Sequence, residues 1–228
     1  MKFNPGKCTI LSIHRSQPPF SKFYSLCGAV LQHTNEAKYL GVTLTGDMEW
    51  STHVQQIVSK SNSVLGLLKR NLSKCPLKLR EQAFISLIRS RLEYCSAIWD
   101  PRLTRDANLL EAVHRRGARF VKQDYGRTSS VTQMLQDLNW KPLKDRRRDI
   151  RLALLLKIIK GNIAVETEGI LIKGDHRTRN KYRHLKFSSI QYQNSFFVKT
   201  IPDFNTTTKA SFEADIPAPL AGSRAATP

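Results

Sequence analysis

The sequence is poor in acidic residues and lacks the patterns that most catalytic sites require. Of 228 residues, 18 are Asp or Glu and 37 are Lys or Arg, which gives a formal net charge of +19 at pH 7. No two Asp residues are adjacent, and Asp145 and Asp149 stand among arginines that would act as their charge partners. The G-x-S-x-G, Walker and G-x-G-x-x-G motifs are absent. We therefore expect no catalytic residue, metal or cofactor in this chain.

Cysteine is scarce, and its spacing excludes the usual cysteine-based sites. Cys8, Cys27, Cys75 and Cys95 are far apart, with no C-x-x-C pair. A structural zinc site needs ligands in closely spaced pairs, which the six histidines do not supply either. A secreted disulfide framework would be shorter and denser in cysteine. We expect four reduced thiols, mostly buried.

Long hydrophobic runs are also missing. No apolar stretch approaches the roughly 20 residues that cross a bilayer, and the first residues lack the apolar segment of a secretory signal. We expect an intracellular protein, nuclear or cytoplasmic. So large an excess of positive charge repels itself unless a polyanion neutralises it. Nucleic acid is the favoured partner, an anionic membrane surface is the second, and charge for solubility alone is the third.

The first 46 residues are predicted to form short strands. A turn at Asn4-Pro5-Gly6 precedes a β-branched run at 8–13, and further strand candidates lie at 23–31 and 37–44, with a polar turn at 33–36 between them. So few short strands cannot close a core. We expect them to complete a sheet that begins elsewhere.

From residue 51 the apolar residues recur at helical spacing. The pattern predicts helices from 51, over 76–99 and over 105–122, a short helix capped by Ser130 and Gln133, and a last helix from Pro142 to Gly161. A buried strand is predicted at 195–198 and a disordered tail from 216. The predicted fold class is α+β, mainly α, with a short antiparallel β part followed by a helical bundle and an irregular basic C-terminal segment.

Two predicted helix faces are rich in cationic residues. On the helix at 105–122 these residues lie opposite an apolar stripe or on its flank, and on the last helix they recur at i, i+3, i+4 and i+7. An ordinary solvated face would mix both signs of charge, so phosphate contact is favoured. The candidate nucleic-acid-binding residues are Arg115, Arg116, Arg119, Lys122, Lys144, Arg147, Arg148 and Arg151.

Other basic and aromatic features leave alternatives open. The basic stretch at 173–186 is either a binding arm or a flexible tail. Trp140 and Tyr182 could stack on nucleic-acid bases, although a place in the core is favoured for both.

Several blocks resemble, in order, one family of polymerases. The Asn-Pro-Gly-Lys-Cys run at 4–8 and the Lys-Tyr-Leu-Gly-Val run at 38–42 look like the last palm motifs of reverse transcriptases from non-LTR retrotransposons of the jockey-like LINE group. The block at 91–101 is similar to a motif of the family's thumb region. Further blocks that resemble the family lie at 110–121, 138–148 and 195–205, so the resemblance covers roughly residues 3 to 214.

The resemblance implies a role for each region. Residues 1–46 would end the palm, 47–162 would form a helical thumb-like bundle, 163–215 a basic C-terminal segment and 216–228 a disordered tail. The thumb would close on an RNA–DNA hybrid through its backbone and shape. Lys7 would lie where a palm lysine assists the leaving pyrophosphate. The primer-grip-like hairpin would consist of Tyr39, Leu40, Gly41 and Val42.

The sequence also departs from the family pattern. The catalytic Asp-Asp block, which would bind Mg²⁺, would lie before residue 1. Gly117 replaces a usual alanine, which should weaken its helix by up to about 1 kcal/mol, and Phe204 replaces a usual tryptophan.

The expected function is that of a C-terminal fragment of an RNA-directed DNA polymerase. It would bind RNA or RNA–DNA hybrid through phosphates and polymerise nothing alone, with the upstream polymerase part as a further partner. The alternative is a co-opted, non-enzymatic protein-interaction module, whose unpaired strand edges would favour pairing. A third reading, an active polymerase, would need carboxylates from another chain. The oligomeric state is left open.

Overall fold

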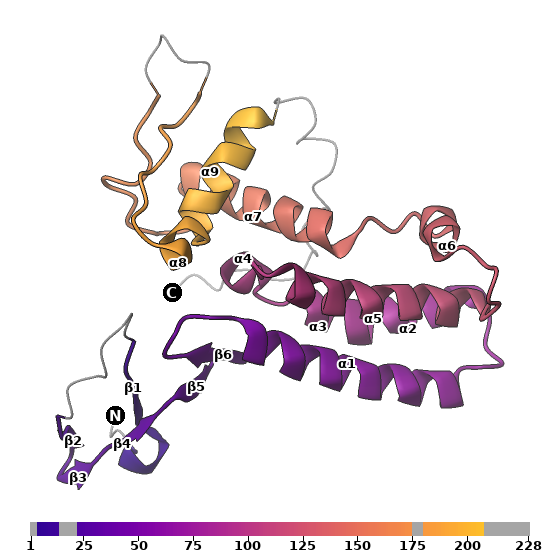
Figure 1. Cartoon of the computed structure of the whole chain (residues 1–228), viewed down its shortest axis with the longest axis horizontal. Coiled ribbons are helices and arrows are strands. Elements are labelled where there is room, and N and C mark those ends of the chain that lie inside the picture. Colours follow the sequence, from indigo (N-terminus) through magenta and orange to yellow (C-terminus); the bar gives the residue numbers. More distant parts are fainter. Residues whose placement is uncertain (1–3, 14–21, 175–179, 208–228) are drawn as a thin grey trace, which may run out of the picture. The chain divides into compact units, whose positions relative to one another are not determined.

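The computed structural model describes residues 4–13, 22–174 and 180–207. These residues form a mainly helical structure with a few short strands (Figure 1), which confirms the predicted α+β, mainly α class. The chain divides into two compact units, Met1–Ile150 and Arg151–Pro228, and the division falls within the long helix α7 (Leu143–Ile159). Each unit is described on its own.

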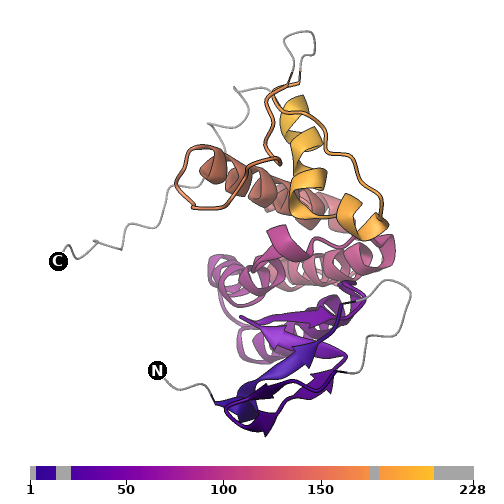
Figure 2. The same ribbon diagram turned by 90° about the vertical axis from the view of Figure 1, so that its left-hand side faces the viewer.

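The strands of the first unit pair two by two, and one of the pairs is parallel, so the expectation of antiparallel strands holds only for the two hairpins. After the short 3-10 turn η1 (Pro5–Lys7), β1 (Thr9–Leu11) pairs in parallel with β4 (Gln32–Thr34). Two antiparallel hairpins join β2 (Ser25–Leu26) to β3 (Ala29–Val30), and β5 (Glu36–Tyr39) to β6 (Val42–Thr45). Figure 2 shows these strands gathered beside the helices of the same unit.

The structure corrects the predicted strands at three places. The run 23–31 is not one strand, because Cys27 and Gly28 adopt φ values of 50° and 80° and turn the chain into a hairpin. In the same way Leu40 and Gly41, at 46° and 87°, divide the run 37–44. The expected polar turn at 33–36 is largely strand, since β4 pairs with a segment more than 20 residues away, which local composition does not reveal.

The helices of the first unit follow the predicted periodicity, with one exception. Their bounds are α1 (Ser51–Asn71), α2 (Leu77–Phe84), the π-helical turn η2 (Ile85–Arg89), α3 (Ser90–Glu93), α4 (Ser96–Trp99), α5 (Thr104–Lys122) and α6 (Val131–Asp137). The exception is the predicted helix at 76–99, which is interrupted. Cys95 takes a left-handed φ of 53° there, and the Trp99 indole N–H donates to the Tyr94 carbonyl at 2.7 Å across the break.

The apolar face of α5 packs against α1 and α2 to form the core of the first unit. Val54 and Leu65 of α1 and Val113 and Val121 of α5 are almost fully buried in one continuous cluster. Each such side chain contributes roughly 1.5–3 kcal/mol when it leaves water. This packing fixes the opposite, cationic side of α5 at the surface.

Gly117 is the point of closest approach between α5 and α2. A Cβ built on Gly117 would lie 2.8 Å from Cδ2 of Phe84 and nearer still to two other atoms of that ring. The Phe84 ring is fully buried and stacks on Trp140 at 4.8 Å. The glycine therefore does more than lower helix propensity, since its missing side chain makes room for the ring.

The second unit contains the later turns of α7 and two further helices, α8 (Ile190–Gln193) and α9 (Phe196–Thr206). Its apolar cluster joins Leu152 and Leu155 of α7 to Phe204 of α9. The predicted strand at 195–198 is wrong, because Ser195 precedes a helix whose buried residues Val198 and Ile201 recur at helical spacing.

Several other expectations are decided only in part. All four cysteines are free thiols, as expected, but none is fully buried. The predicted tail at 216–228 and residues 175–179 of the basic stretch lie outside the described residues. Within the described ranges, no helix combines the length and apolar character needed to cross a membrane.

Candidate nucleic-acid interface

The cationic side of α5 is exposed as its periodicity predicts. Arg115 and Arg116 are exposed, and Arg119 and Lys122 are half-buried, on the side of α5 away from the core. Arg116 donates to the Asn62 side chain of α1, and Arg119 donates to the Gly126 carbonyl at 3.2 Å. Both acceptors are neutral, but Asp124 lies close enough to Arg119 for the arginine to help lower the pKa of that carboxyl, so the charge of Arg119 is partly balanced.

Lys122 and Arg115, both on this side of α5, differ in whether a carboxylate of the protein neutralises their charge. Lys122 forms an ion pair with Asp137 at 2.9 Å, so its charge is partly neutralised. Arg115 has no hydrogen-bond or ion-pair partner among the described residues, so its guanidinium is available to a ligand. The structure therefore brings all four predicted residues to one helix side, and Arg115 and Arg116 are the strongest candidates.

The predicted cationic wall on α7 does not form. Arg147 is only 1% exposed and donates to Asp100 at 2.8 Å, and Arg151 is 4% exposed and donates to Asp203 at 2.8 Å. A buried guanidinium must be paired, because an uncompensated buried charge is costly. Burial thus removes both arginines from the candidate surface, and Lys144 and Arg148 remain exposed.

The hairpin that resembles a primer grip presents two side chains to solvent. Tyr39 is 67% exposed and Leu40 is 73% exposed, whereas Val42 points into the core. The Tyr94 hydroxyl donates to the Leu40 carbonyl at 3.1 Å, and a Cβ on Gly41 would lie 3.4 Å from the Tyr94 ring. Tyr94 therefore holds the tip of the hairpin against the segment that follows α3.

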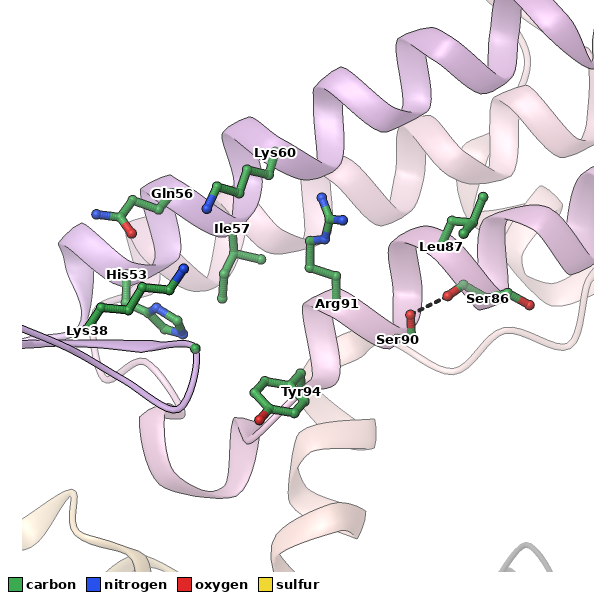
Figure 3. Close-up of a pocket in the computed structure, with 11 residues that line it drawn as sticks. Lys38, His53, Gln56, Ile57, Lys60, Ser86, Leu87, Ser90, Arg91 and Tyr94 are labelled. Atoms are coloured by element: carbon green, nitrogen blue, oxygen red, sulfur yellow. Dashed lines mark hydrogen bonds between the residues drawn. The ribbon is translucent and has the colours of Figure 1, made fainter. Parts of the chain in front are cut away.

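A pocket of about 510 Å³ lies between this hairpin, α1 and the η2–α3 segment (Figure 3). Three cationic side chains enter it from three elements: Lys38 from β5, Lys60 from α1 and Arg91 from α3. The described residues that line it include no carboxylate. The full lining is Lys38, Gly41, His53, Gln56, Ile57, Lys60, Ser86, Leu87, Ser90, Arg91 and Tyr94.

Apart from Gly41 of the primer-grip-like hairpin, the residues that line the pocket were not among the sequence candidates. Lys38 and Arg91 belong to two of the family-like blocks, and Lys60 continues a polar stripe on α1 that begins with His53 and Gln56. The sequence alone shows this stripe, since residues 53, 56 and 60 fall on one face of a helix. Nothing in the sequence says which elements close over it.

His53 is the buried polar group of the pocket. It is 4% exposed, its Nδ1 accepts the Thr43 backbone N–H at 3.2 Å, and its ring meets the Trp99 ring edge-on at 5.3 Å. Burial and the charges of Lys38 and Lys60 lower the pKa of His53. The ring is therefore neutral at pH 7, with its proton on Nε2 because Nδ1 is an acceptor.

Trp140, a candidate for base stacking, lies in the core. Its ring is stacked between Phe84 at 4.8 Å and His114 at 5.0 Å, and the Arg89 guanidinium lies over it at 4.4 Å. Burial, together with the Arg89 and Arg146 charges, lowers the pKa of His114 to about 3. Trp140 is thus a packing residue.

Tyr182, the other aromatic candidate, is half-buried. It packs on the cluster of the second unit, with its ring 5.9 Å from that of Phe204. Its backbone N–H and C=O are both held by the Asn205 side chain, at 3.0 and 2.8 Å. These contacts favour a structural role.

The described residues contain no group of three or more His, Cys, Asp or Glu side chains that could hold a metal ion. Comparison of the chain with protein-family models, with curated proteins and with solved structures finds no match in any of the three. The chemistry of the surface and of the pocket is therefore the basis for a function.

Proposed function

We propose that this chain binds RNA or an RNA–DNA hybrid through the phosphate backbone, as the C-terminal part of a non-LTR retrotransposon reverse transcriptase. The observation that carries the binding proposal is the pair Arg115 and Arg116, exposed on the side of α5 opposite the core, in a chain of net charge +19. Arginine offers a planar fork for phosphate oxygens, and release of counterions from the strand supplies the driving force.

The family part of the proposal rests on the order of the sequence blocks. In this proposal the strands at 1–46 are the end of a palm, the helices up to residue 162 are the thumb, and the β5–β6 hairpin has the place of a primer grip. Support comes from the tight turn at Leu40 and Gly41, where the glycine adopts a φ of 87° and joins β5 to β6 in a hairpin.

Binding is tested by the salt dependence of the affinity for a labelled RNA–DNA hybrid. Six to eight phosphate contacts give a log–log slope of roughly −5 to −7, with a Kd around 10⁻⁴–10⁻⁶ M at physiological salt. A flat salt response refutes the proposal. Primer extension on a homopolymer template with Mg²⁺ is expected to give no product, and extension would refute the claim that this chain polymerises nothing alone.

The position of the interface is tested by a matched pair of double variants. Arg115→Ala/Arg116→Ala is expected to reduce the salt slope by about 1.5–2, since each lost contact removes somewhat less than one unit. The control Lys157→Ala/Lys160→Ala removes one exposed charge from the last turn of α7 and another from the residue that follows the helix, and it is expected to change the slope much less. Equal losses would mean that binding follows net charge and not the α5 surface.

The family assignment has its own test. An in-frame or frameshifted Ala-Asp-Asp block in the DNA upstream of the Met1 codon is expected. An upstream region without any polymerase-like block would refute the assignment and leave the binding proposal untouched.

A protein-interaction module is the second candidate, and a cluster of exposed apolar side chains favours it. Leu40, Leu87, Tyr94 and Ile98 are each at least half exposed around the hairpin and the η2–α4 segment. Such residues fit a protein partner if the complex with that partner survives treatment with RNase and DNase. Loss of the complex on nuclease treatment would eliminate this candidate.

A further inference from the structure

The pocket beside the β5–β6 hairpin concentrates positive charge that the protein itself does not neutralise. Lys38, Lys60 and Arg91 form no ion pair within the described part of the chain, although other cations, such as Arg146 and Arg147, do. All three are exposed, and no acidic residue lines the space between them. The pocket therefore attracts an anion from solution.

Thr43 prepares two further groups of the pocket as hydrogen-bond donors. Its backbone N–H occupies Nδ1 of His53, and its hydroxyl donates to Oε1 of Gln56 at 2.8 Å. The acceptor atom of each side chain is thus used. This leaves the Nε2–H of His53, which is buried without a partner among the described residues, as the free donor of that ring, and the amide NH₂ of Gln56 as the free end of that side chain.

The unpartnered His53 nitrogen is the second observation that points to a ligand. A buried N–H without a partner is destabilising relative to a satisfied one. An oxyanion in the pocket would satisfy this N–H. It would also meet Lys38 and Lys60, the two charges that act on the same ring.

The volume and the apolar lining of the pocket indicate which groups the ligand carries besides the oxyanion. A volume of about 510 Å³ is in the range of sites for whole small molecules, which is more room than a bare oxyanion needs. Tyr94 and Leu87, both half exposed, supply an aromatic ring and an apolar surface at the same site. Aromatic rings of this kind stack on nucleobases.

The number of cations distinguishes between two phosphate chemistries. An internal phosphodiester carries one negative charge, whereas a terminal phosphate monoester carries about −1.5 to −2 at neutral pH and has three free oxygens. Three cations match the monoester better. We propose that this pocket binds the terminal phosphate of a nucleic-acid strand, with the adjoining base against Tyr94.

This inference deepens the proposed function and rests on it for the identity of the strand. It is tested with the full chain and three probes: a short single-stranded RNA with a 5′-phosphate, the same RNA with a 5′-hydroxyl, and a nucleoside 5′-monophosphate. The phosphorylated RNA is expected to bind about tenfold tighter than the hydroxyl form, as one charge-assisted contact provides. A 3′-phosphorylated RNA identifies which end is preferred, and preference for either end supports the inference.

Two variants connect this preference to the pocket. Lys60→Ala/Arg91→Ala is expected to abolish the preference for the phosphate while leaving affinity for the hydroxyl form within about twofold. Both residues are exposed, so the fold should persist, and Lys60→Arg should keep the preference. As the matched control, Arg115→Ala/Arg116→Ala should weaken both RNA forms equally and leave their ratio unchanged.

An independent readout comes from His53. Because an anion favours the charged form of a neighbouring imidazole, the phosphorylated RNA should raise the pKa of His53, followed by NMR of the ring nitrogens, and the hydroxyl form should not. Equal affinity for both RNAs, or a preference that survives loss of Lys60 and Arg91, overturns the inference.

The outcomes separate this inference from the proposed function. Tight binding of the free monophosphate, with no gain from the attached strand, overturns the assignment to a strand end and makes the pocket a nucleotide site. Absence of binding to any nucleic acid refutes the proposed function itself, whereas equal binding of both RNA forms refutes only the terminal-phosphate pocket.

Discussion

Substitution of Gly117 by alanine provides a stringent test of the packing between α2 and α5. Judged by helix propensity alone, alanine should stabilise the middle of α5 by about 1 kcal/mol. The structure predicts the opposite, because the new methyl group would lie within 3 Å of the Phe84 ring. That ring cannot move aside easily, since Trp140 stacks on it at 4.8 Å.

The magnitude follows from the balance of these two effects. Overpacking of a full core costs typically about 1–3 kcal/mol, which cancels or exceeds the gain in propensity. We expect Gly117→Ala to lower the free energy of unfolding by up to about 2 kcal/mol. Gly66 provides the matched control, because it also lies within a long helix and an added Cβ there would meet only Arg70 Nη1, at 3.6 Å. Gly66→Ala should stabilise the protein by up to about 1 kcal/mol.

The assay is urea unfolding of the full chain followed by tryptophan fluorescence. Trp50, Trp99 and Trp140 all belong to the first unit, so the signal reports the unit that contains both glycines. The Phe84→Leu variant, made in both backgrounds, completes a double-mutant cycle, and removal of the ring should recover about 1–3 kcal/mol in the Gly117→Ala background. If Gly117→Ala stabilises the protein as much as Gly66→Ala, the close approach of the two helices is refuted.

Three further perturbations test the polar parts of the first unit. In the folded chain the pKa of His114 is about 3, below the unfolded value of 6.5. The neutral ring therefore contributes its full stability above about pH 6.5, and the free energy of unfolding decreases as the pH falls toward 3, by about 2 kcal/mol at pH 5. Urea unfolding at pH 7 and 5 should show this loss, and His114→Gln should abolish most of it. Arg147→Met should cost about 3–5 kcal/mol in thermal or urea unfolding because it removes one partner of a buried ion pair and leaves the charge of Asp100 less well compensated. Adding Asp100→Asn should recover part of the loss, and a neutral single variant would contradict the buried pair. Ser130→Ala should cost about 0.5–2 kcal/mol by the same assay, since the Ser130 hydroxyl accepts the Gln133 N–H at 3.3 Å and caps α6.

The elements that were predictable from the sequence are those whose signals are local. The helix α5 matches its prediction at 105–122 to within one residue, because an uninterrupted apolar stripe specifies both its extent and its buried side. The cap of α6 was also predictable, since Ser130 and the N–H that it binds are three residues apart.

The misassigned elements depend on contacts between distant segments. The turn at Cys95 divides a run with continuous helical periodicity, and the Trp99–Tyr94 hydrogen bond that accompanies the turn needs the folded chain. Residues 195–198 are apolar and short enough for a strand, but Val198 is followed by Ile201 and Phe204 on the same side of a helix. A short apolar run alone cannot distinguish these two cases.

The two cationic helix faces show the same limit for function. On α5 the apolar stripe itself indicates which side is exposed, so Arg115 and Arg116 were correctly placed at the surface. On α7 the i, i+3, i+4, i+7 pattern is equally regular. Arg147 and Arg151 are nevertheless buried, and each pairs with a carboxylate, 47 and 52 residues away in the chain. Spacing tells which residues share a face, and only the tertiary structure tells whether that face is covered.

The pocket extends this reasoning to a site that no single segment indicates. Val42 and Thr43 are both buried although they are neighbours in β6, which breaks the usual alternation of a strand, because Val42 packs in the core while Thr43 meets the polar stripe of α1. A buried threonine needs hydrogen-bond partners, and His53 and Gln56, three residues apart on α1, provide them. The same contacts use the acceptor atom of both partners, so each of them keeps only N–H donors free. The polar stripe on α1 is the part of the proposed site that the sequence shows, whereas the burial of Thr43 and its two contacts are visible only in the folded chain.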